Sequence, residues 1–570
     1  MNTIAERLLQ IYEQSPRSIA VRLLVNKTPD KVISFHGLIQ GSAGYSAALQ
    51  QAGVHPGEVV ILILKHSTDL LYAFFGAVLH GCIPAIMPFL TEKLSPEQYR
   101  HSLMSLFKIT APAAIITYPE FLGEVRRAIT PGSSVREIIS CNRINTTQDI
   151  KSISFESGVN RLPEDIVLLQ HSSGTTGLQK GVALSHQAVF NQLSSYSHAL
   201  ELDSSDVVVS WLPLYHDMGL IAGFLLPILS KIPLVLLSPF DWVRAPHMLL
   251  KAVTKYKGTL SWLPNFAYNF CAQKIRPRDL EGIDLSSWRA VSNCSEPMYY
   301  RSHQMFMDRF QGYGLHPSAL TTCYAMAENV FAVSQGGIKG PVTIDRISQH
   351  SLLVDRVAVP CNNNDDAINM LSAGRPIANT QVKILDQSHI QLPERHLGEI
   401  ALSSNCMLTG YYNRPDLSSS TFHHGWYLTG DLGYIADGEI YITGRKKDLI
   451  IVGGKNIYPQ DLESLAGEVH GVHPGRVVAF GIPNETTGTE DVVMIAEVDT
   501  HDHNLTDDDF YNLPEFNRIS DEIRLRVTRG SDIALRFVKL VHRGWLIKTS
   551  SGKIARNANR ERYLAEIKGG

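Results

Sequence analysis

The sequence predicts an α/β protein with a large N-terminal domain of α/β sheets, a small β-rich part at the end of that domain, and an α+β C-terminal domain. One observation is a series of short, continuous apolar runs bounded by polar residues, glycine or proline, at residues 58–64, 113–117 and 231–237. Such runs suit strands that are covered on both faces. A second observation is that residues 70–90 and 220–239 each have the pattern of a buried helix followed by a buried strand.

A change of pattern near residue 381 predicts the domain division. Short apolar segments between glycine and aspartate turns follow at residues 382–385, 398–402 and 439–443, which favours a β-rich unit. After Gly444 the pattern becomes α+β and more charged. We therefore expect an N-terminal domain of residues 1–445, whose β-rich part is about 376–445, and a C-terminal domain of residues 446–570.

Composition and charge exclude several classes of protein. Of the 570 residues, 44% are hydrophobic and 19% are charged, as in a globular protein rather than a disordered one. The formal net charge is -3, so no strong field indicates nucleic acid or an anionic membrane as a partner. Proline, glycine or charged residues interrupt both long apolar stretches, and neither supplies the about 20 apolar residues that a transmembrane segment needs.

The cysteines and the N-terminus indicate a cellular location. The 7 cysteines are scattered, odd in number and without a C-x-x-C pair, which argues for reduced thiols and against a disulfide framework or a zinc site. The N-terminus lacks the basic start and long apolar run of a signal peptide. We therefore expect buried structural thiols and a cytoplasmic protein.

A loop rich in serine, threonine and glycine is the first indication of chemistry. Residues 172–177 (Ser-Ser-Gly-Thr-Thr-Gly) follow the apolar run 166–169, and a helix is expected to begin near Ser185. Backbone N–H groups and hydroxyls in such a loop can surround phosphates, and glycine allows close approach. The loop does not fit the Walker A pattern, and alone it is equally consistent with a flexible surface loop.

Four more motifs accompany this loop: Tyr-Ala-Met-Ala-Glu at 324–328, Tyr-Leu-Thr-Gly-Asp at 427–431, Gly-Arg-Lys-Lys-Asp at 444–448 and Lys-Thr-Ser-Ser-Gly-Lys at 548–553. With these five motifs in this order, the chain resembles, over nearly its whole length, the adenylate-forming superfamily of acyl-CoA synthetases, peptide-synthetase adenylation domains and firefly-type luciferases. The resemblance implies a mobile C-terminal domain and an ATP-dependent activation of a carboxylate that releases pyrophosphate.

The resemblance also implies roles for individual residues. Lys553 would be the catalytic cation at the carboxylate and the α-phosphate, where two anions must meet. Glu328, a second catalytic candidate, and Thr175 would hold Mg²⁺, a hard ion that prefers oxygen ligands. Asp431 and Arg445 would bind the ribose hydroxyls. The other implied nucleotide-binding residues are Ser172, Ser173, Gly174, Thr176, Gly177, Lys180, Asn293, Cys294, Ser295, Glu296, Tyr324, Ala325, Met326, Ala327 and Lys447.

Lys447 matches the hinge position of the superfamily. Rotation there would replace Lys553 by another face of the C-terminal domain, on which Gly453 and Gly454 would let a pantetheine arm approach. A charged residue at position 447 is also consistent with a plain surface.

Residues 211–220, 238–240 and 264–269 resemble one branch of the superfamily, the fatty acyl-AMP ligases, which pass acyl adenylates to acyl carrier proteins. In this resemblance His216, a further catalytic candidate, lies at the mouth of the acyl pocket. Residues 334–372 stand where that branch carries an insertion thought to restrain the rotation that CoA transfer needs, although a surface excursion is the alternative. The candidate pocket residues, each also consistent with ordinary core, are Trp211, Trp262, Asn265, Phe266 and Asn269.

Some residues depart from the pattern and leave the acceptor open. Ala325 stands where glycine is usual, Ile547 where proline is usual, and residues 452–456 look more like CoA ligases than acyl-AMP ligases. We expect the enzyme to use ATP, Mg²⁺ and a fatty acid, and to transfer the acyl group to the phosphopantetheine of an acyl carrier protein or a polyketide or peptide synthase carrier domain. CoA is the alternative acceptor. Amino-acid adenylation, a luciferase-type oxidation and a non-catalytic nucleotide-binding module are the other hypotheses.

Overall fold

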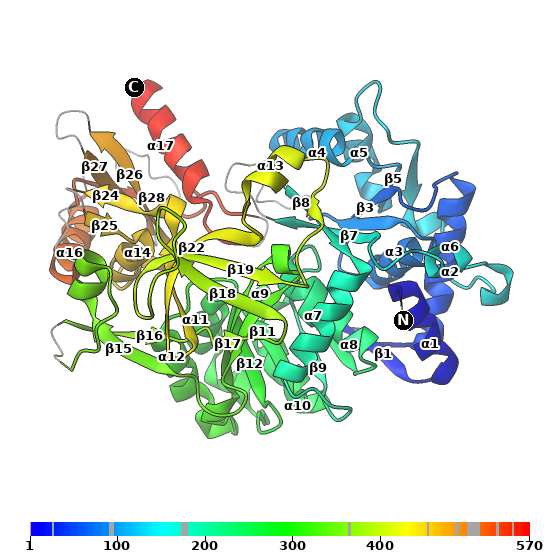
Figure 1. Ribbon diagram of the computed structural model, residues 1–570, viewed down its shortest axis with the longest axis horizontal. Coiled ribbons are helices and arrows are strands. Elements are labelled where there is room, and N and C mark those ends of the chain that lie inside the picture. Colours follow the sequence, from blue (N-terminus) through cyan, green and yellow to red (C-terminus); the bar gives the residue numbers. More distant parts are fainter. Residues whose placement is uncertain are drawn as a thin grey trace.

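The computed structural model describes residues 2–25, 28–89, 96–172, 180–362, 366–452, 455–484, 489–498, 513–531, 535–549 and 552–569. The chain forms a large N-terminal part of two sheets with their helices, a β-rich layer, and a smaller C-terminal unit at the other end of the molecule (Figure 1). The predicted α/β fold is confirmed.

A mixed, mostly parallel sheet carries the segments of greatest interest. Its nine strands among the described residues lie in the order β17 (Arg375–Pro376), β14 (Ala332–Gly336), β13 (Leu320–Ala325), β12 (Ala290–Cys294), β11 (Leu260–Leu263), β9 (Val208–Ser210), β10 (Leu234–Leu237), β1 (Ile19–Leu24) and β2 (Lys31–Ser34). Strands β11, β12 and β13 are parallel neighbours. Their carboxyl ends therefore meet at one edge of the sheet, where ligands of open α/β sheets bind.

The second sheet explains why its strands appear in the sequence as continuous apolar runs. Its seven described strands lie in the order β20 (Gly410–Tyr411), β8 (Lys180–Ser185), β7 (Ile166–Ser172), β4 (Ile83–Ile86), β3 (Val59–Ile63), β5 (Ala114–Thr117) and β6 (Glu137–Ser140). In β3, Val60 and Leu62 belong to the main core, whereas Ile61 and Ile63 pack in a second core with helices on the other face. Because both faces are covered, no polar alternation is needed.

The helices of the N-terminal part pack on both sheets. Those in the described residues are α1 (Ile4–Gln14), α2 (Phe35–Gln51), α3 (Thr68–Leu79), α4 (Pro96–Thr110), α5 (Leu122–Ala128), α6 (Glu156–Val159), α7 (His186–Ala199), α8 (Leu226–Leu229), α9 (Pro239–Arg244), α10 (His247–Tyr256), α11 (Asn265–Lys274), α12 (Tyr300–Phe310) and α13 (Pro415–Ser420). Helix α7 begins as predicted, since the Ser185 side chain accepts a hydrogen bond from the N–H of Ala188. Within the described ranges, no helix has the length and apolar character needed to cross a membrane.

The stretch 220–239 differs in one respect from the expected helix and strand. A π-helix over Met218–Leu225 precedes α8 and β10. Gly219 lies so close to the preceding turn that a Cβ atom there would be 2.2 Å from the carbonyl oxygen of Pro213. The apolar pattern does not distinguish the wider π turn from an ordinary helix. This π-helix begins immediately after His216 and Asp217, and Asp217 is its N-cap residue.

The β-rich layer follows the nine-stranded sheet in the chain. Its strands are β18 (Thr380–Leu385), β19 (Gly398–Ser404), β21 (Phe422–His423), β22 (Trp426–Ala436) and β23 (Glu439–Arg445). Before it, β15 (Ile344–Ser348) and β16 (Ala367–Leu371) form an antiparallel hairpin within the 334–372 segment. The segment is thus an ordered element rather than a featureless loop, although residues 363–365 lie outside the described ones.

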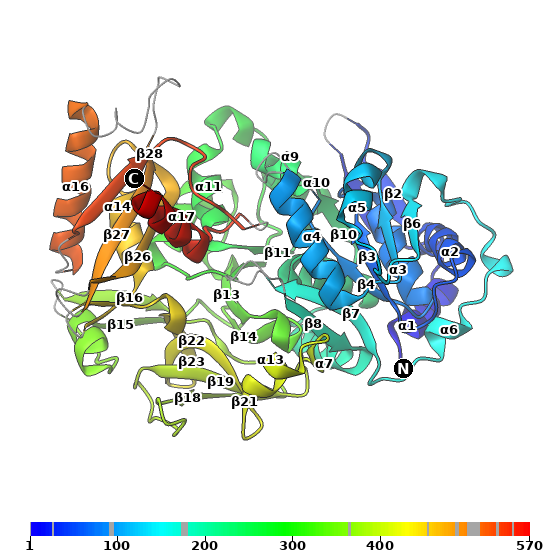
Figure 2. The same ribbon diagram turned by 90° about the horizontal axis from the view of Figure 1, so that it is seen from above.

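The C-terminal unit has its own cores. It contains the hairpin of β24 (Ile450–Val452) and β25 (Lys455–Ile457), the sheet of β26 (Val472–Asn484), β27 (Thr489–Val498) and β28 (Phe537–Val541), and the helices α14 (Pro459–Gly467), α16 (Pro514–Ser531) and α17 (Arg556–Gly569). Two apolar clusters hold these elements together and contain no residue before Ile450 among the buried ones. We propose the domain boundary after residue 445, between β23 and β24. Figure 2 shows the segment before α17 reaching from this unit toward the N-terminal part.

Candidate active site

The turn that follows β12 meets the C-terminal unit. Lys553 donates a hydrogen bond from Nζ to the carbonyl oxygen of Ser295 at 2.5 Å. Ser295 has a φ of +67°, an uncommon conformation for a residue with a side chain, and it turns this carbonyl out of the strand direction. The amino group that the sequence predicts to be catalytic therefore lies at the carboxyl edge of the nine-stranded sheet, 258 positions away in the chain.

Lys553 is held on a tight turn. The backbone N–H of Thr549 donates to the carbonyl of Lys553 at 2.7 Å, and that of Gly552 donates to the carbonyl of Thr549 at 2.9 Å. Gly552 has a φ of +88°, which glycine adopts without steric cost. The motif thus presents its final lysine from a closed backbone loop. Residues 550 and 551 of the motif lie outside the described chain.

Asp431 is the centre of a second cluster. Its Oδ2 accepts a hydrogen bond from the hydroxyl of Tyr324 at 2.6 Å, and its Oδ1 accepts one from Nε of Arg445 at 3.0 Å. Desolvation, followed by the charge of Asp431, raises the pKa of Tyr324 well above its usual range. Asp431 also raises the pKa of Arg445. Three residues that the sequence assigned to the nucleotide are therefore hydrogen-bonded to one another.

Glu328 lies on the loop after β13 and is held from the seven-stranded sheet. Its Oε1 accepts a hydrogen bond from the hydroxyl of Tyr411 at 2.9 Å, and its backbone carbonyl accepts one from Leu408 at 2.8 Å. The Nζ of Lys180 lies 4.9 Å from the centre of the Tyr411 ring. Tyr411 thus contacts both Glu328, from the loop after β13, and Lys180, from β8. Oε2 of Glu328 has no hydrogen-bond partner among the described residues.

The predicted phosphate loop can be placed only at its ends. Strand β7 carries Ser172 and β8 begins at Lys180, and the two strands pair at these residues. Residues 173–179, which include the predicted ligands Ser173, Gly174, Thr175, Thr176 and Gly177, lie outside the described residues, as does the Ser172 side chain. The loop therefore connects two strand ends next to Tyr411 and Glu328.

The segment predicted to line the adenine is fixed by amide hydrogen bonds. Asn293 is fully buried, and its Nδ2 donates to Oδ1 of Asn265 at 2.9 Å. Cys294 is also fully buried, at the end of β12. Ala325 ends β13, and Met326 and Ala327 follow it at the same sheet edge. These contacts fix the backbone of the edge, while the adenine role of the residues stays a prediction.

The predicted hinge lies beside the Asp431 cluster. Lys446 donates from Nζ to Oε2 of Glu399 at 2.8 Å. Desolvation, followed by the charge of Arg445, lowers the pKa of Lys447, although its side chain remains exposed. Gly453 and Gly454 lie outside the described residues, so the predicted pantetheine face is not among the features that the structure places.

His216 is a neutral group at the site. Desolvation, followed by the charge of Lys553, lowers the pKa of His216 to about 3. Its Nε2 is buried and has no hydrogen-bond partner among the described residues. Desolvation raises the pKa of the adjacent Asp217, against the attraction of Lys553. A neutral imidazole with an unsatisfied nitrogen is available to a bound substrate as a donor or an acceptor.

Aromatic rings pack against one another at the residues predicted to line the acyl pocket. Trp211 stacks on Trp242 with ring centres 3.5 Å apart, and Phe266 meets both rings edge to face. Trp211 and Trp242 are buried, whereas Phe266 is 36% exposed, so Phe266 covers the outer side of the stack. Oδ1 of Asn269 is buried without a partner in the described part of the chain. Trp211 and Phe266 therefore belong to one aromatic group, Asn269 lies one turn after Phe266 on α11, and a pocket role for the three residues stays a prediction.

Trp262 has a different environment from the other pocket candidates. It is 1% exposed, and its Nε1 donates to the hydroxyl of Tyr196 at 2.6 Å. Tyr196 in turn donates to Gln335 at 3.0 Å. This arrangement places Trp262 in the packed interior between β11 and α7, and a wall role for it stays a prediction.

Sequence reasoning missed Trp242 and Tyr411. Each is an aromatic residue outside the motifs that carry the resemblance, and no local pattern marks it as part of a site. Only the fold brings Trp242 onto Trp211 and Tyr411 onto Glu328. The segment 238–240, which was noted for its resemblance, ends two residues before Trp242 and is the closest available signal.

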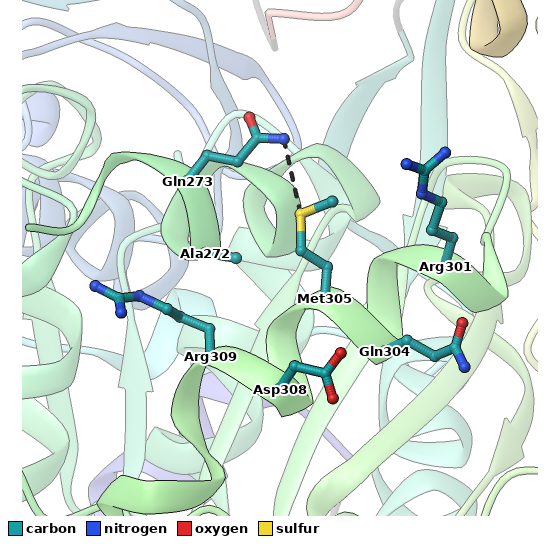
Figure 3. Close-up of a pocket in the computed structure, with 7 residues that line it drawn as sticks. All are labelled: Ala272, Gln273, Arg301, Gln304, Met305, Asp308 and Arg309. Carbon is teal, nitrogen blue, oxygen red and sulfur yellow. Dashed lines mark hydrogen bonds between the residues drawn. The ribbon is translucent and has the colours of Figure 1, made fainter. Parts of the chain in front are cut away.

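A surface pocket of about 580 Å³ lies over α11 and α12 (Figure 3). Its lining residues are Ala272, Gln273, Arg301, Gln304, Met305, Asp308 and Arg309. None of the predicted site residues is among them. The same helices begin at the sheet edge described above, and Arg301 forms an ion pair with Glu468 of the C-terminal unit. The pocket therefore lies outside the candidate site, beside the seam between the two units.

Comparisons with known proteins show the family of the chain. Residues 10–412 match the family model described as AMP-binding enzyme. The chain belongs to this family.

Two relatives are similar over most of the chain. A medium-chain-fatty-acid--[acyl-carrier-protein] ligase, JamA, of Moorena producens is 32% identical over 93% of this chain and 90% of the relative. A long-chain-fatty-acid--AMP ligase, FadD32, of Mycolicibacterium smegmatis is 30% identical over 91% of this chain and 87% of its own. A solved structure from a study of fatty acyl-adenylate ligases of E. coli and L. pneumophila matches with a TM-score of 0.88 at 26% identity, covering 100% of this chain and 99% of that one.

Proposed function

We propose that this AMP-binding enzyme activates a fatty acid with ATP and transfers the acyl group to the phosphopantetheine thiol of an acyl carrier protein. The observation that carries the proposal is the contact between Lys553 and the Ser295 carbonyl, which brings a cation to the sheet edge near the Asp431 cluster. The relatives named as fatty-acid ligases support the acyl group.

In the first step, a carboxylate oxygen of the acid attacks the α-phosphorus of ATP. A bond between that oxygen and phosphorus forms, the bond from the α-phosphorus to the bridging oxygen breaks, and pyrophosphate leaves with the electron pair. Both reactants are anions, so a positioned cation lowers the barrier by stabilising the charge that gathers at the α-phosphate. Lys553 has this role in the proposal.

Asp431 and Glu328 would hold the nucleotide and its metal. A carboxylate fixed by Tyr324 and Arg445 can accept hydrogen bonds from both ribose hydroxyls. Glu328 fits a Mg²⁺ ligand, because one carboxylate oxygen is oriented by Tyr411 and the other has no partner in the described chain. When bound, Mg²⁺ supplies positive charge to the phosphate oxygens. Thr175 remains a proposed second ligand.

The 334–372 segment favours a carrier protein over CoA as the acceptor. Its residue Leu352 is buried in one apolar cluster with Tyr458, which lies beyond the proposed domain boundary. The hairpin therefore packs on the start of the C-terminal unit, and a rotation at Lys447 must break this contact. A carrier protein can bind the enzyme surface and offset that cost, whereas free CoA brings fewer contacts.

Mass spectrometry with both acceptors tests the proposal. The enzyme is given ATP, Mg²⁺ and a panel of straight-chain, aromatic and amino acids, and then either CoA or a panel of phosphopantetheinylated carrier proteins. Fatty acyl-AMP that accumulates with CoA and is transferred to a carrier supports the proposal. Rapid acyl-CoA formation favours a CoA ligase, the second candidate, which the CoA-ligase-like residues 452–456 support. ATP binding without pyrophosphate release for any acid of the panel would indicate a nucleotide-binding module.

We also propose a cytoplasmic location. All 7 cysteines, each of which lies in the described part of the chain, are free thiols. Reduced thiols of this kind are typical of the cytoplasm. Fractionation of the native host with detection of the protein by antibody tests this location.

A further inference from the structure

Glu296 stands between the two halves of the candidate site. It follows Ser295, whose carbonyl accepts the hydrogen bond from Lys553, in the turn after β12. The resemblance predicts that the backbone of this segment lines the adenine. The Glu296 side chain has a separate partner, because its Oε2 accepts a hydrogen bond from the backbone N–H of Phe266 at 3.0 Å.

This hydrogen bond caps a helix that carries acyl-pocket candidates. Phe266 lies in the first turn of α11, and the first four N–H groups of a helix have no partner within it. The N-cap residue, Pro264, makes no side-chain capping hydrogen bond. A carboxylate is favourable at a helix N-terminus, so Glu296 supplies the missing cap from another part of the chain. Phe266 and Asn269 are thereby tied to the turn that Lys553 contacts.

A second tie runs parallel to the first. Oδ1 of Asn265 accepts hydrogen bonds from Nδ2 of Asn293 at 2.9 Å and from the backbone N–H of Tyr299 at 3.2 Å. The start of α11 is thus attached to residues on both sides of Glu296. If the Glu296 carboxylate is removed, α11 is still attached through Asn265. The effect of the Glu296 charge can therefore be measured separately from the effect of the Glu296 hydrogen bond.

The charges that face Glu296 come from the C-terminal unit. Desolvation raises the pKa of the Glu296 carboxyl, and the charge of Lys553, the hydrogen bond from the Phe266 N–H and the charge of Lys548, in this order, act against the shift. Both lysines belong to the turn that presents the catalytic candidate. A carboxylate shielded from water attracts a nearby cation more strongly than an exposed one does. The Nζ of Lys553 bonds to the carbonyl of Ser295, the residue directly before Glu296, which brings this charge close to the Glu296 carboxylate.

We propose that Glu296 is a positioning residue for adenylation, which joins the start of the acyl-pocket helix α11 to the docked Lys553. The inference rests on the proposed function. The position of α11 against a bound fatty acid and the docking of Lys553 then both depend on the Glu296 carboxylate. When the C-terminal unit rotates away for thiol transfer, Glu296 keeps its hydrogen bond to Phe266 and loses only its cation.

Two variants of Glu296 separate its two contacts. Glu296→Gln keeps an oxygen that can accept from the Phe266 N–H and removes the charge, whereas Glu296→Ala removes both. Adenylation is measured by pyrophosphate release with decanoic acid and with the best acid of the panel, and transfer is measured separately from synthetic acyl-AMP. For Glu296→Gln we expect kcat of adenylation to fall roughly tenfold with the KM for the acid within about twofold of wild type. For Glu296→Ala we expect the KM to rise as well.

The split between the half-reactions distinguishes positioning from a merely structural role. The Gln variant should transfer the acyl group at close to the wild-type rate, because Lys553 does not take part in that step. An equal loss in both half-reactions, or wild-type adenylation by the Gln variant, overturns the proposal. Glu120→Gln, at an exposed position far along the chain, is the matched control and should behave as wild type.

A labelling experiment tests the inference without any acid. The rate at which acetic anhydride modifies Lys553 is read by peptide mass spectrometry in the full-length protein. The rate should increase at least about threefold in Glu296→Gln, because the ammonium loses its counter-charge and the turn leaves the site more often. Lys539, which is paired with Glu566 within the C-terminal unit, should not change. An unchanged rate at Lys553 overturns the inference. If the wild-type enzyme releases pyrophosphate with none of the acids of the panel, the proposed function is overturned instead.

Discussion

The nucleotide side of the site and the reacting cation are built in different ways. Asp431, Tyr324 and Arg445, the proposed ribose site, all lie before the proposed boundary and are joined by hydrogen bonds to Asp431, so this cluster belongs to one domain. Lys553 comes from a unit with its own cores and reaches the sheet edge through a hydrogen bond to a single backbone carbonyl. Under the proposed roles, this difference makes ATP binding and bond formation separable, because a domain movement would withdraw only Lys553.

The largest effect is expected at Lys553. Lys553→Ala should lower the rate of acyl-AMP formation by roughly 10²–10³-fold, the loss seen when one group that stabilises transition-state charge is removed. The Kd for ATP should change by less than about threefold, because the Asp431 cluster is intact. Pyrophosphate release and equilibrium binding of ATP measure the two quantities. Loss of both to the same degree would mean that the lysine holds ATP in the ground state.

Substitution of Asp431 should affect ATP binding more than the rate of acyl-AMP formation. Asp431→Ala removes a carboxylate to which Tyr324 and Arg445 donate, and hydrogen bonds to charged groups contribute about 1.5–3 kcal/mol each. We expect the KM for ATP to rise by about 10- to 100-fold, with a smaller effect for Asp431→Asn, which keeps one acceptor oxygen. Steady-state kinetics at saturating acid give the values. An unchanged KM would remove Asp431 from the ribose site.

How much the sequence predicts differs between the same two regions. The α/β core was predictable because strands such as β3 are buried on both faces and leave continuous apolar runs. The meeting of Tyr324 with Asp431, 107 positions apart, follows from no local pattern, and only the family resemblance brought the two residues together beforehand. The cap that Glu296 provides for α11 was not predicted at all, because local signals report caps from neighbouring residues and this one comes from 30 positions away.

The 334–372 segment offers a test of intermediate size. Leu352 is 3% exposed in the cluster with Tyr458, whereas Val354, on the same turn, is 51% exposed. Leu352→Ala should weaken the contact that holds the C-terminal unit and raise the rate of transfer to CoA by roughly tenfold, since core truncations of this kind cost about 2–5 kcal/mol where packing is complete. Val354→Ala is the matched control. If the two variants transfer the acyl group to CoA at equal rates, the segment does not determine the choice of acceptor.

The smallest effect is expected at the ion pair between Arg301 and Glu468. The pair crosses the seam between the two units, but the Arg301 side chain is 67% exposed. Exposed pairs contribute about 0–1 kcal/mol, so Arg301→Ala should lower adenylation by no more than about fivefold, and less at high salt. Lys339→Ala, at an 83% exposed side chain, is the control. A loss as large as that of Lys553→Ala would place the pair among the determinants of docking.

One measurement tests the central claim, that this enzyme joins a fatty acid to AMP at the edge where Lys553 meets β12. The wild-type protein is incubated with ATP, Mg²⁺ and the acid panel without any thiol, and its nucleotide products are resolved by mass spectrometry. We expect enzyme-bound fatty acyl-AMP together with an equal amount of pyrophosphate. Formation of ADP and phosphate, with no acyl-AMP for any acid, would contradict it.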